Sequence, residues 1–192
     1  MKRIVLIMKK IVLIIFSLWL FQENIFAQTE DLWKLNLFTP SLEFEKSIGP
    51  RNTLAQKAGI TYTGSYPPLT EPSIGTGILL QLAPFYDIQS RWYYNFEKRK
   101  AKGKSIENNN GNYLTLRAQY ISPEITASFV RYSPHTFKIG PHWGLQRNEG
   151  VIHYYFNIGP AYIFDDIGNG AIWPIEFEFR LGWLLKKKNR EN

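Results

Sequence analysis

The segment at positions 173–183 shows the clearest alternation of apolar and polar residues in the chain. Its odd positions carry large apolar side chains, and the even positions after the proline carry charged residues or glycine. Successive side chains of a β-strand point to opposite faces, so the pattern predicts a strand with one aromatic face and one charged face. The apolar set is Trp173, Ile175, Phe177, Phe179, Leu181 and Trp183, and the polar set is Glu176, Glu178, Arg180 and Gly182.

The difference between the two faces indicates the environment of this predicted strand. A strand of a membrane β-barrel turns apolar side chains toward lipid, keeps polar side chains in the lumen and carries aromatic residues near the interfaces. The segment fits this description, with tryptophan at both ends of its apolar face. A strand of a soluble β-sandwich is the alternative, because the alternation within one strand is a weak signal.

Seven further segments alternate in the same way and are separated by turn residues. Eight strands of about ten residues match the smallest outer-membrane barrels. The sequence therefore predicts an all-β fold, an eight-stranded antiparallel up-and-down transmembrane β-barrel. The predicted strands are 33–38, 41–46, 53–63, 78–95, 112–121, 136–146, 151–164 and 173–183.

The connections between these segments are rich in glycine, proline and asparagine, which are typical of turns. The connection at 97–111 is expected to be solvated, basic and flexible, and 147–150 is expected to be a tight hairpin turn. Pro84 falls on the outward face of its segment and requires a bulge or a local gap in the ladder. The remaining loops are expected at 66–76, 122–135 and 165–170.

The strand count decides on which side of the membrane the termini lie. An even count returns both termini to the periplasmic side. Thr39 and Pro40 separate the first two segments. If these segments form one bent strand, the count is seven and this sidedness fails.

The N-terminal residues 1–27 are expected to be a secretory signal peptide. A basic start precedes an apolar run at 11–21 of only 11 residues, and Ala27 ends a plausible cleavage site. That run is too short to span a bilayer, which needs about 20 residues. The predicted organisation is a signal at 1–27, a barrel at 28–185 and a polar basic tail at 186–192. The expected location is the outer membrane of a Gram-negative bacterium.

The composition is consistent with a barrel in lipid. The chain contains 11 Tyr, 13 Phe and 6 Trp, and such aromatic residues favour strands and interface belts. It contains no cysteine, which excludes disulfides, thiolate metal sites and cysteine nucleophiles. The expected partners are outer-membrane lipid and the barrel-assembly machinery, and no nucleic-acid partner or cofactor is expected.

The inward positions of the predicted strands carry nearly balanced charge. An eight-stranded barrel is just wide enough to be filled by side chains, and enclosed charges must be paired. We therefore expect ion pairs that plug the lumen, with no open pore, and a structural or surface-interaction role without catalysis. The lumen ion-pair candidates are Glu43, Glu45, Lys57, Asp87, Arg91, Arg117, Lys138, Glu176, Glu178 and Arg180, together with Lys34.

Catalytic and metal-binding interpretations of the same residues are weaker. Glu176 and Glu178 share a face and could form an acid/base pair, but nearby bases favour ion pairs. His142 and His153 both face inward, yet no third metal ligand stands at a diagnostic spacing. A lipid-modifying outer-membrane enzyme of the lipid A deacylase kind carries a His-x-Ser pair. None of His135, His142 and His153 has serine two places later.

A soluble periplasmic barrel that binds a lipid-like ligand is another alternative. It would need apolar residues inside, whereas tryptophan and tyrosine at the ends of the apolar faces favour lipid outside. The basic connection could contact anionic lipid or cell-wall polymer, although runs of charge are often merely solvated. Its cations are Lys98, Arg99, Lys100, Lys102 and Lys104.

Three blocks of the chain carry a family resemblance. The blocks at 35–45, 91–113 and 140–147 are similar to small outer-membrane β-barrel proteins of unknown function from Bacteroidetes-type bacteria. The resemblance implies an OmpA-like transmembrane fold of eight strands and supplies no activity. In contrast to the OmpA pattern, no C-terminal peptidoglycan-binding domain is expected, and the last predicted strand is followed by a basic segment.

Overall fold

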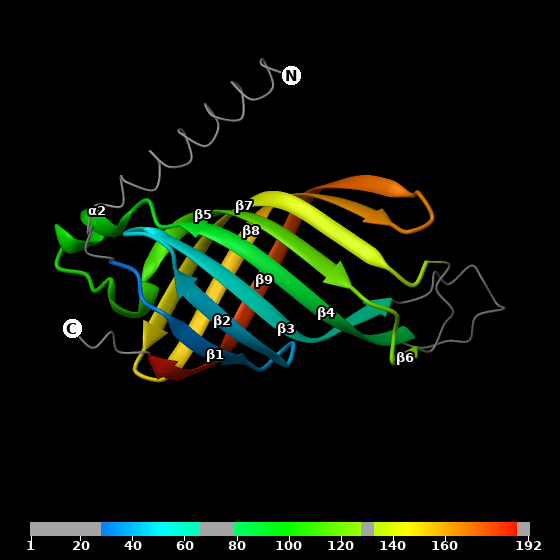
Figure 1. The fold of residues 1–192 in the computed structure, drawn as a ribbon, viewed down its shortest axis with the longest axis horizontal. Coiled ribbons are helices and arrows are strands. Elements are labelled where there is room, and N and C mark those ends of the chain that lie inside the picture. Colours follow the sequence, from blue (N-terminus) through cyan, green and yellow to red (C-terminus); the bar gives the residue numbers. More distant parts are fainter. Residues whose placement is uncertain (1–27, 66–78, 128–132, 188–192) are drawn as a thin grey trace, which may run out of the picture.

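The computed structural model describes residues 28–65, 79–127 and 133–187, so the expected signal peptide lies outside the described residues. Within them the fold is almost entirely β, with the strands wound around a common axis (Figure 1). The strands are β1 Leu32–Asn36, β2 Ser41–Ser47, β3 Asn52–Ser65, β4 Leu79–Trp92, β5 Gly111–Ile121, β6 Thr126–Ala127, β7 Thr136–Glu149, β8 Ile152–Asp165 and β9 Gly170–Lys187.

Eight of these strands close into an antiparallel barrel. The order β3-β2-β1-β9-β8-β7-β5-β4 is closed by pairing of β3 with β4, and the short β6 pairs with β4 beyond the end of β5. The predicted all-β, eight-stranded antiparallel barrel is therefore confirmed. β1 and β2 are separate strands in register with each other, so the count is eight and not seven.

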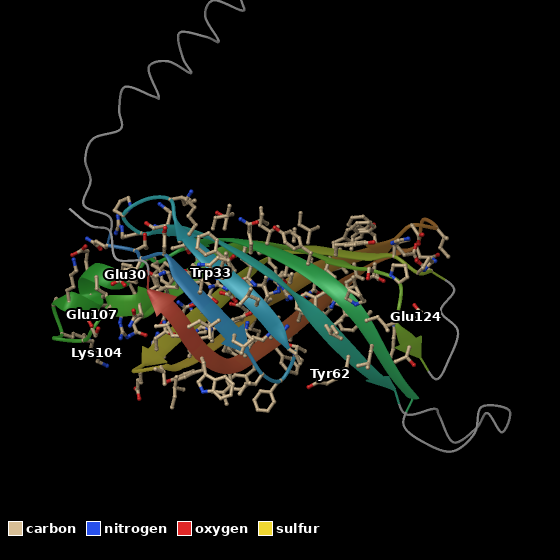
Figure 2. All side chains as sticks on the ribbon, turned by 60° about the horizontal axis from the view of Figure 1, so that its bottom comes forward. Glu30, Trp33, Tyr62, Lys104, Glu107 and Glu124 are labelled. Carbon is tan, nitrogen blue, oxygen red and sulfur yellow. The ribbon has the colours of Figure 1, made fainter. Side chains whose placement is uncertain are left out.

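The two ends of the barrel differ, and we name them by what they carry. The terminal end is where Leu32 of β1 pairs with Lys187 of β9, and the loop end carries the connection between β8 and β9. Glu30, Lys104 and Glu107 lie at the terminal end and Glu124 at the loop end (Figure 2). β9 continues two residues into the expected basic tail, of which 188–192 lie outside the described residues.

The barrel wall follows the predicted alternation. In β4, Asp87, Gln89 and Arg91 are at most 1% exposed, whereas the outward side chain of Trp92 is 45% exposed. In β9, Glu178 is buried and its outward neighbour Phe177 is 72% exposed. The polar face of each ribbon is therefore the concave face, and the apolar face is the outer surface.

The alternation fails at the start of β9. The register with β8 shifts beside Pro174, so that Trp173 stands opposite the buried Ala161. The ammonium of Lys138, an inward side chain, lies 5.9 Å from the centroid of the Trp173 ring. The prediction that Trp173 shares the outer face of Phe177 is wrong, because one extra residue in a bulged strand reverses the faces beyond it.

Pro84 lies at a gap in the ladder between β4 and β5, as predicted. The β4–β5 ladder ends at the pair Phe85 and Ile121, and pairing resumes where β6 meets Leu82. The Ser122 amide donates to the Pro84 carbonyl at 2.9 Å, so the missing N–H of the proline falls where the ladder is already open.

The wall is lower on the side of β1 and β2. These strands have 5 and 7 residues, whereas β9 has 18. Among the described residues, the part of β9 from Gly170 to Arg180 is therefore paired with β8 alone. Ile175, in this part of β9, is 67% exposed.

The basic connection after β4 is ordered, contrary to the expectation of a flexible loop. It forms helix α2, Phe96–Lys100, and the 3-10 helix η1, Glu107–Asn109. The Asn109 amide exchanges two hydrogen bonds with the Glu30 backbone, at 2.8 and 2.9 Å. Neither helix of the described part is long and apolar enough to cross a membrane. The expected turn at 147–150 is also shorter, because β7 continues to Glu149.

Candidate functional site

A column of charged side chains fills the barrel interior. All ten candidate positions and Lys34 point inward, and each takes part in at least one ion pair. All are buried except Lys138, whose side chain is 22% exposed near the loop end. The column divides into three connected groups along the barrel.

The group nearest the terminal end is built on the register of the β1–β2 hairpin. Lys34 stands directly opposite Glu43, and its ammonium lies 3.0 Å from Glu43 and 2.5 Å from Glu45. Arg91 reaches across from β4 and places a guanidinium nitrogen 3.0 Å from Glu43. The amide oxygen of Gln146, on β7, accepts from both cations at 2.9 and 3.0 Å.

The central group joins opposite walls of the barrel. Glu178 on β9 lies 2.6 Å from the Lys57 ammonium and 2.7 Å from the Arg180 guanidinium. Asp87 on β4 lies 2.6 Å from Arg117 on β5. A weaker contact of 3.9 Å connects Lys57 to Asp87, its cross-strand neighbour on β4.

The group nearest the loop end surrounds Glu176. Its carboxylate lies 2.8 Å from the Lys138 ammonium and 3.4 Å from Arg117. The Nε2 atom of His142 is 3.5 Å from the same carboxylate. Glu176 and Glu178 are thus each held by several cations, which is the geometry of structural ion pairs rather than of an acid/base pair.

Neutral side chains connect the groups, and the sequence patterns did not identify them as partners. Gln89 accepts from Arg91 at 2.9 Å and donates to Asp87 at 2.9 Å, which joins the first group to the second. The Tyr155 hydroxyl accepts from Lys57 at 2.5 Å, and the Tyr93 hydroxyl donates to Glu45 at 2.7 Å. The sequence signal that could have identified these side chains is that the alternation places them on the inner face.

Aromatic rings lie between this column and the terminal end. Tyr93, Phe96 and Tyr113 are each 0% exposed and pack together with Ile106 beside them. The Tyr93 ring centroid is 4.8 Å from that of Phe96 and 5.2 Å from that of Tyr113. Phe96 belongs to α2, so the ordered connection after β4 contributes directly to this packing.

A serine, a histidine and an aspartate come near one another at the loop end. The Ser133 hydroxyl donates to Asp166 at 2.5 Å and holds the pKa of that carboxyl below its usual range. The Nδ1 atom of His135 is hydrogen-bonded to the Tyr120 hydroxyl at 2.7 Å. The serine hydroxyl thus contacts a carboxylate and the backbone carbonyl of His135 rather than an imidazole nitrogen, so the arrangement differs from that of a catalytic serine.

The two inward histidines lie in separate environments. His142 faces Glu176, and His153 is hydrogen-bonded to Asn148 at 2.7 Å near the terminal end. Across the described ranges, no three His, Cys, Asp or Glu side chains are grouped so as to hold a metal ion.

The basic connection lies at the terminal end. Lys98, Lys100, Lys102 and Lys104 are exposed, whereas Arg99 is partly buried and donates to the Ser105 carbonyl. These cations belong to α2 and the turn after it, and stand apart from the interior column.

Comparison of the chain with protein-family models, with curated proteins and with solved structures finds no match.

Proposed function

We propose that the chain is a small outer-membrane β-barrel without catalysis, whose ion-paired interior supports a structural or surface-interaction role. The observation that carries this proposal is the inverted distribution of polarity. Among the described residues, 28 buried side chains are polar or charged and only 9 are hydrophobic, three of them tyrosines. Soluble proteins bury apolar side chains and rarely expose a continuous apolar surface. A barrel in lipid has the opposite arrangement.

Aromatic side chains on the outer wall support the same environment. Toward the terminal end, the Trp143 indole donates to the Tyr94 hydroxyl at 2.8 Å. Toward the loop end, neighbouring rings of Tyr120, Phe137 and Phe164 have centroids 5.1 and 5.2 Å apart. Such rings at two levels resemble the aromatic girdles that flank an apolar band.

Two outward tyrosines of one strand also enclose an apolar stretch whose length suits a bilayer. Tyr154 and Tyr162 lie on the same face of β8, eight positions apart. At about 3.3 Å per residue this is about 26 Å along the strand. With strands tilted by about 40° it is about 20 Å along the axis, close to the apolar band of about 25 Å in known barrels.

A soluble lipid-binding barrel is less well supported, because its ligand would need an apolar interior. The interior beside Lys57 and Glu178 is instead occupied by ion pairs and neutral polar groups. The proposed location, after signal cleavage, is the outer membrane of a Gram-negative bacterium. The barrel-assembly machinery and outer-membrane lipid are then the proposed partners, and the terminal end faces the periplasm.

Gel migration of the outer-membrane fraction tests the proposal. A folded membrane barrel resists detergent and migrates differently before and after boiling. We expect the full chain to fractionate with the outer membrane and to show this heat-dependent shift. Recovery of the protein in the soluble periplasmic fraction, with no shift on boiling, would refute the membrane location.

A further inference from the structure

A cleft of about 480 Å³ opens at the terminal end, between the basic connection and the end of β7. Its cationic side chains come from two parts of the chain that lie far apart in sequence. Arg99 and Lys104 come from the connection, and Arg147 comes from β7. The lining also includes the carboxylates of Glu107 and Glu149.

Arg147 points to the outside of the barrel and is held in place by neutral groups. Its strand neighbours Gln146 and Asn148 are buried on the inner face, which places Arg147 on the outer face. Its guanidinium donates to the Gly111 carbonyl and to the Asn112 side-chain oxygen, both at 2.8 Å. These bonds fix the group without cancelling its charge.

Arg99 is fixed in the same manner. Two of its guanidinium nitrogens donate to the Ser105 carbonyl, at 3.1 and 2.8 Å. No ion pair between either arginine and a carboxylate is found among the described residues. The cleft therefore presents two oriented guanidinium groups and one ammonium against the carboxylates of Glu107 and Glu149. Oriented guanidinium groups match the geometry of phosphate oxygens.

The apolar wall of the barrel leads directly into this cleft. Trp143, Leu145 and Arg147 follow one another on the outer face of β7, and Leu114 lies beside Trp143 on β5. The four positions from Trp143 to Arg147 span about 13 Å of strand. Trp143 belongs to the aromatic level near the terminal end, so the cleft lies where lipid headgroups would lie.

We propose that this cleft binds the phosphate of a glycerophospholipid whose acyl chains lie along Trp143, Leu145 and Leu114. The arginines bind the phosphate oxygens, and Lys104 adds charge at the rim. The inference rests on the proposed membrane location, because only a barrel in lipid would meet such a molecule with its outer wall. It identifies a lipid phosphate as the ligand of the basic connection, bound by residues of both the connection and β7.

Native mass spectrometry of the purified full chain in detergent tests the inference. The probes are dilauroyl phosphatidylglycerol, dilauroylglycerol, which lacks the phosphate, and inorganic phosphate. We expect retention of the phosphatidylglycerol but not of the diacylglycerol. R147Q and R99Q should each weaken its retention roughly tenfold, as expected for loss of a charged hydrogen-bond partner. The matched control is K46Q, which removes an exposed outward cation of β2 away from the cleft.

Equal retention by the wild type, R147Q and R99Q would overturn the inference, as would equal retention of the diacylglycerol. Displacement of the lipid by equimolar inorganic phosphate would assign the cleft to free phosphate instead. Each variant is first checked for heat-dependent gel migration, and R99Q, on a short surface helix, remains informative if R147Q fails to fold. A wild-type protein that fractionates with the outer membrane but does not retain phosphatidylglycerol rejects only this inference. A protein absent from that fraction rejects the proposed function.

Discussion

Replacement of Glu178 by glutamine tests whether the interior is closed and dry. The carboxylate lies 2.6 Å from Lys57 and 2.7 Å from Arg180, with a guanidinium nitrogen of Arg117 at 3.5 Å. E178Q keeps the shape of the side chain but leaves three cations around a neutral group. Removing one partner of a buried ion pair destabilises proteins by about 3–5 kcal/mol. With a urea m-value of about 2 kcal/mol/M, the unfolding midpoint should fall by about 1.5–2.5 M.

The assay is urea unfolding of the barrel in detergent, followed by tryptophan fluorescence and by heat-dependent gel migration. The matched control is E149Q, which removes an exposed carboxylate at the terminal end and should change stability by no more than about 0.5 kcal/mol. Conversion of Lys57, Glu178 and Arg180 together to apolar residues of similar size should cost less than E178Q alone, because neither Lys57 nor Arg180 is then left beside a neutral group and Arg117 keeps its contacts with Asp87 and Glu176. An E178Q protein as stable as E149Q would mean that water already solvates these charges, and the argument for a filled lumen would fail.

Three further measurements follow from the proposed barrel. In planar bilayers the purified protein should show no stable single-channel conductance, and a steady large conductance would contradict the filled interior. F177K places a cation on the outer face, opposite Ile158 and midway between Tyr154 and Tyr162, and should destabilise the barrel in lipid by about 2–4 kcal/mol, whereas replacement of the exposed Glu149 by lysine should have little effect. Deletion of the gene should leave the mass profile of lipid A unchanged, whereas a shifted acylation pattern would favour the enzyme.

Much of the barrel could be predicted because strand faces follow from a local rule. The period of two placed Glu43, Lys57 and Asp87 on the inner face without any knowledge of which strands meet. The rule failed where it depended on an unbroken ladder. A single extra residue beside Pro174 turned Trp173 to the inner face at the rim, where it is still 53% exposed, and a sequence pattern marks the proline but not the direction of the bulge.

The order in the basic connection was missed for a different reason. Its composition is that of a solvated loop, and lysines dominate the residues between 98 and 104. The contacts that order it come from elsewhere, because Phe96 packs against Tyr93 and Tyr113, and Asn109 pairs with the backbone of Glu30. Long-range contacts of this kind leave no local periodicity, so the cleft with Arg147 was also absent from the sequence patterns.

The interior charges also explain how the short β1–β2 hairpin keeps its register. Lys34 stands opposite Glu43, Glu43 opposite Lys57, and Lys57 opposite Asp87, so charges alternate in sign across four neighbouring strands. A slip of β2 by one residue would turn its buried ions toward the outer face. A slip of two that brings Ser41 opposite Lys34 would break the direct opposite-charge pairs, whereas the reverse slip would replace Glu43 by Glu45 and disturb only the longer contacts, such as that of Arg91 with Glu43. Buried ion pairs contribute little net stability, because desolvation offsets their attraction. Their clearest effect here is therefore on the register of the strands, because the charges are better paired in the native register than in a shifted one. A lumen lined only with uncharged polar residues would not favour one register in this way.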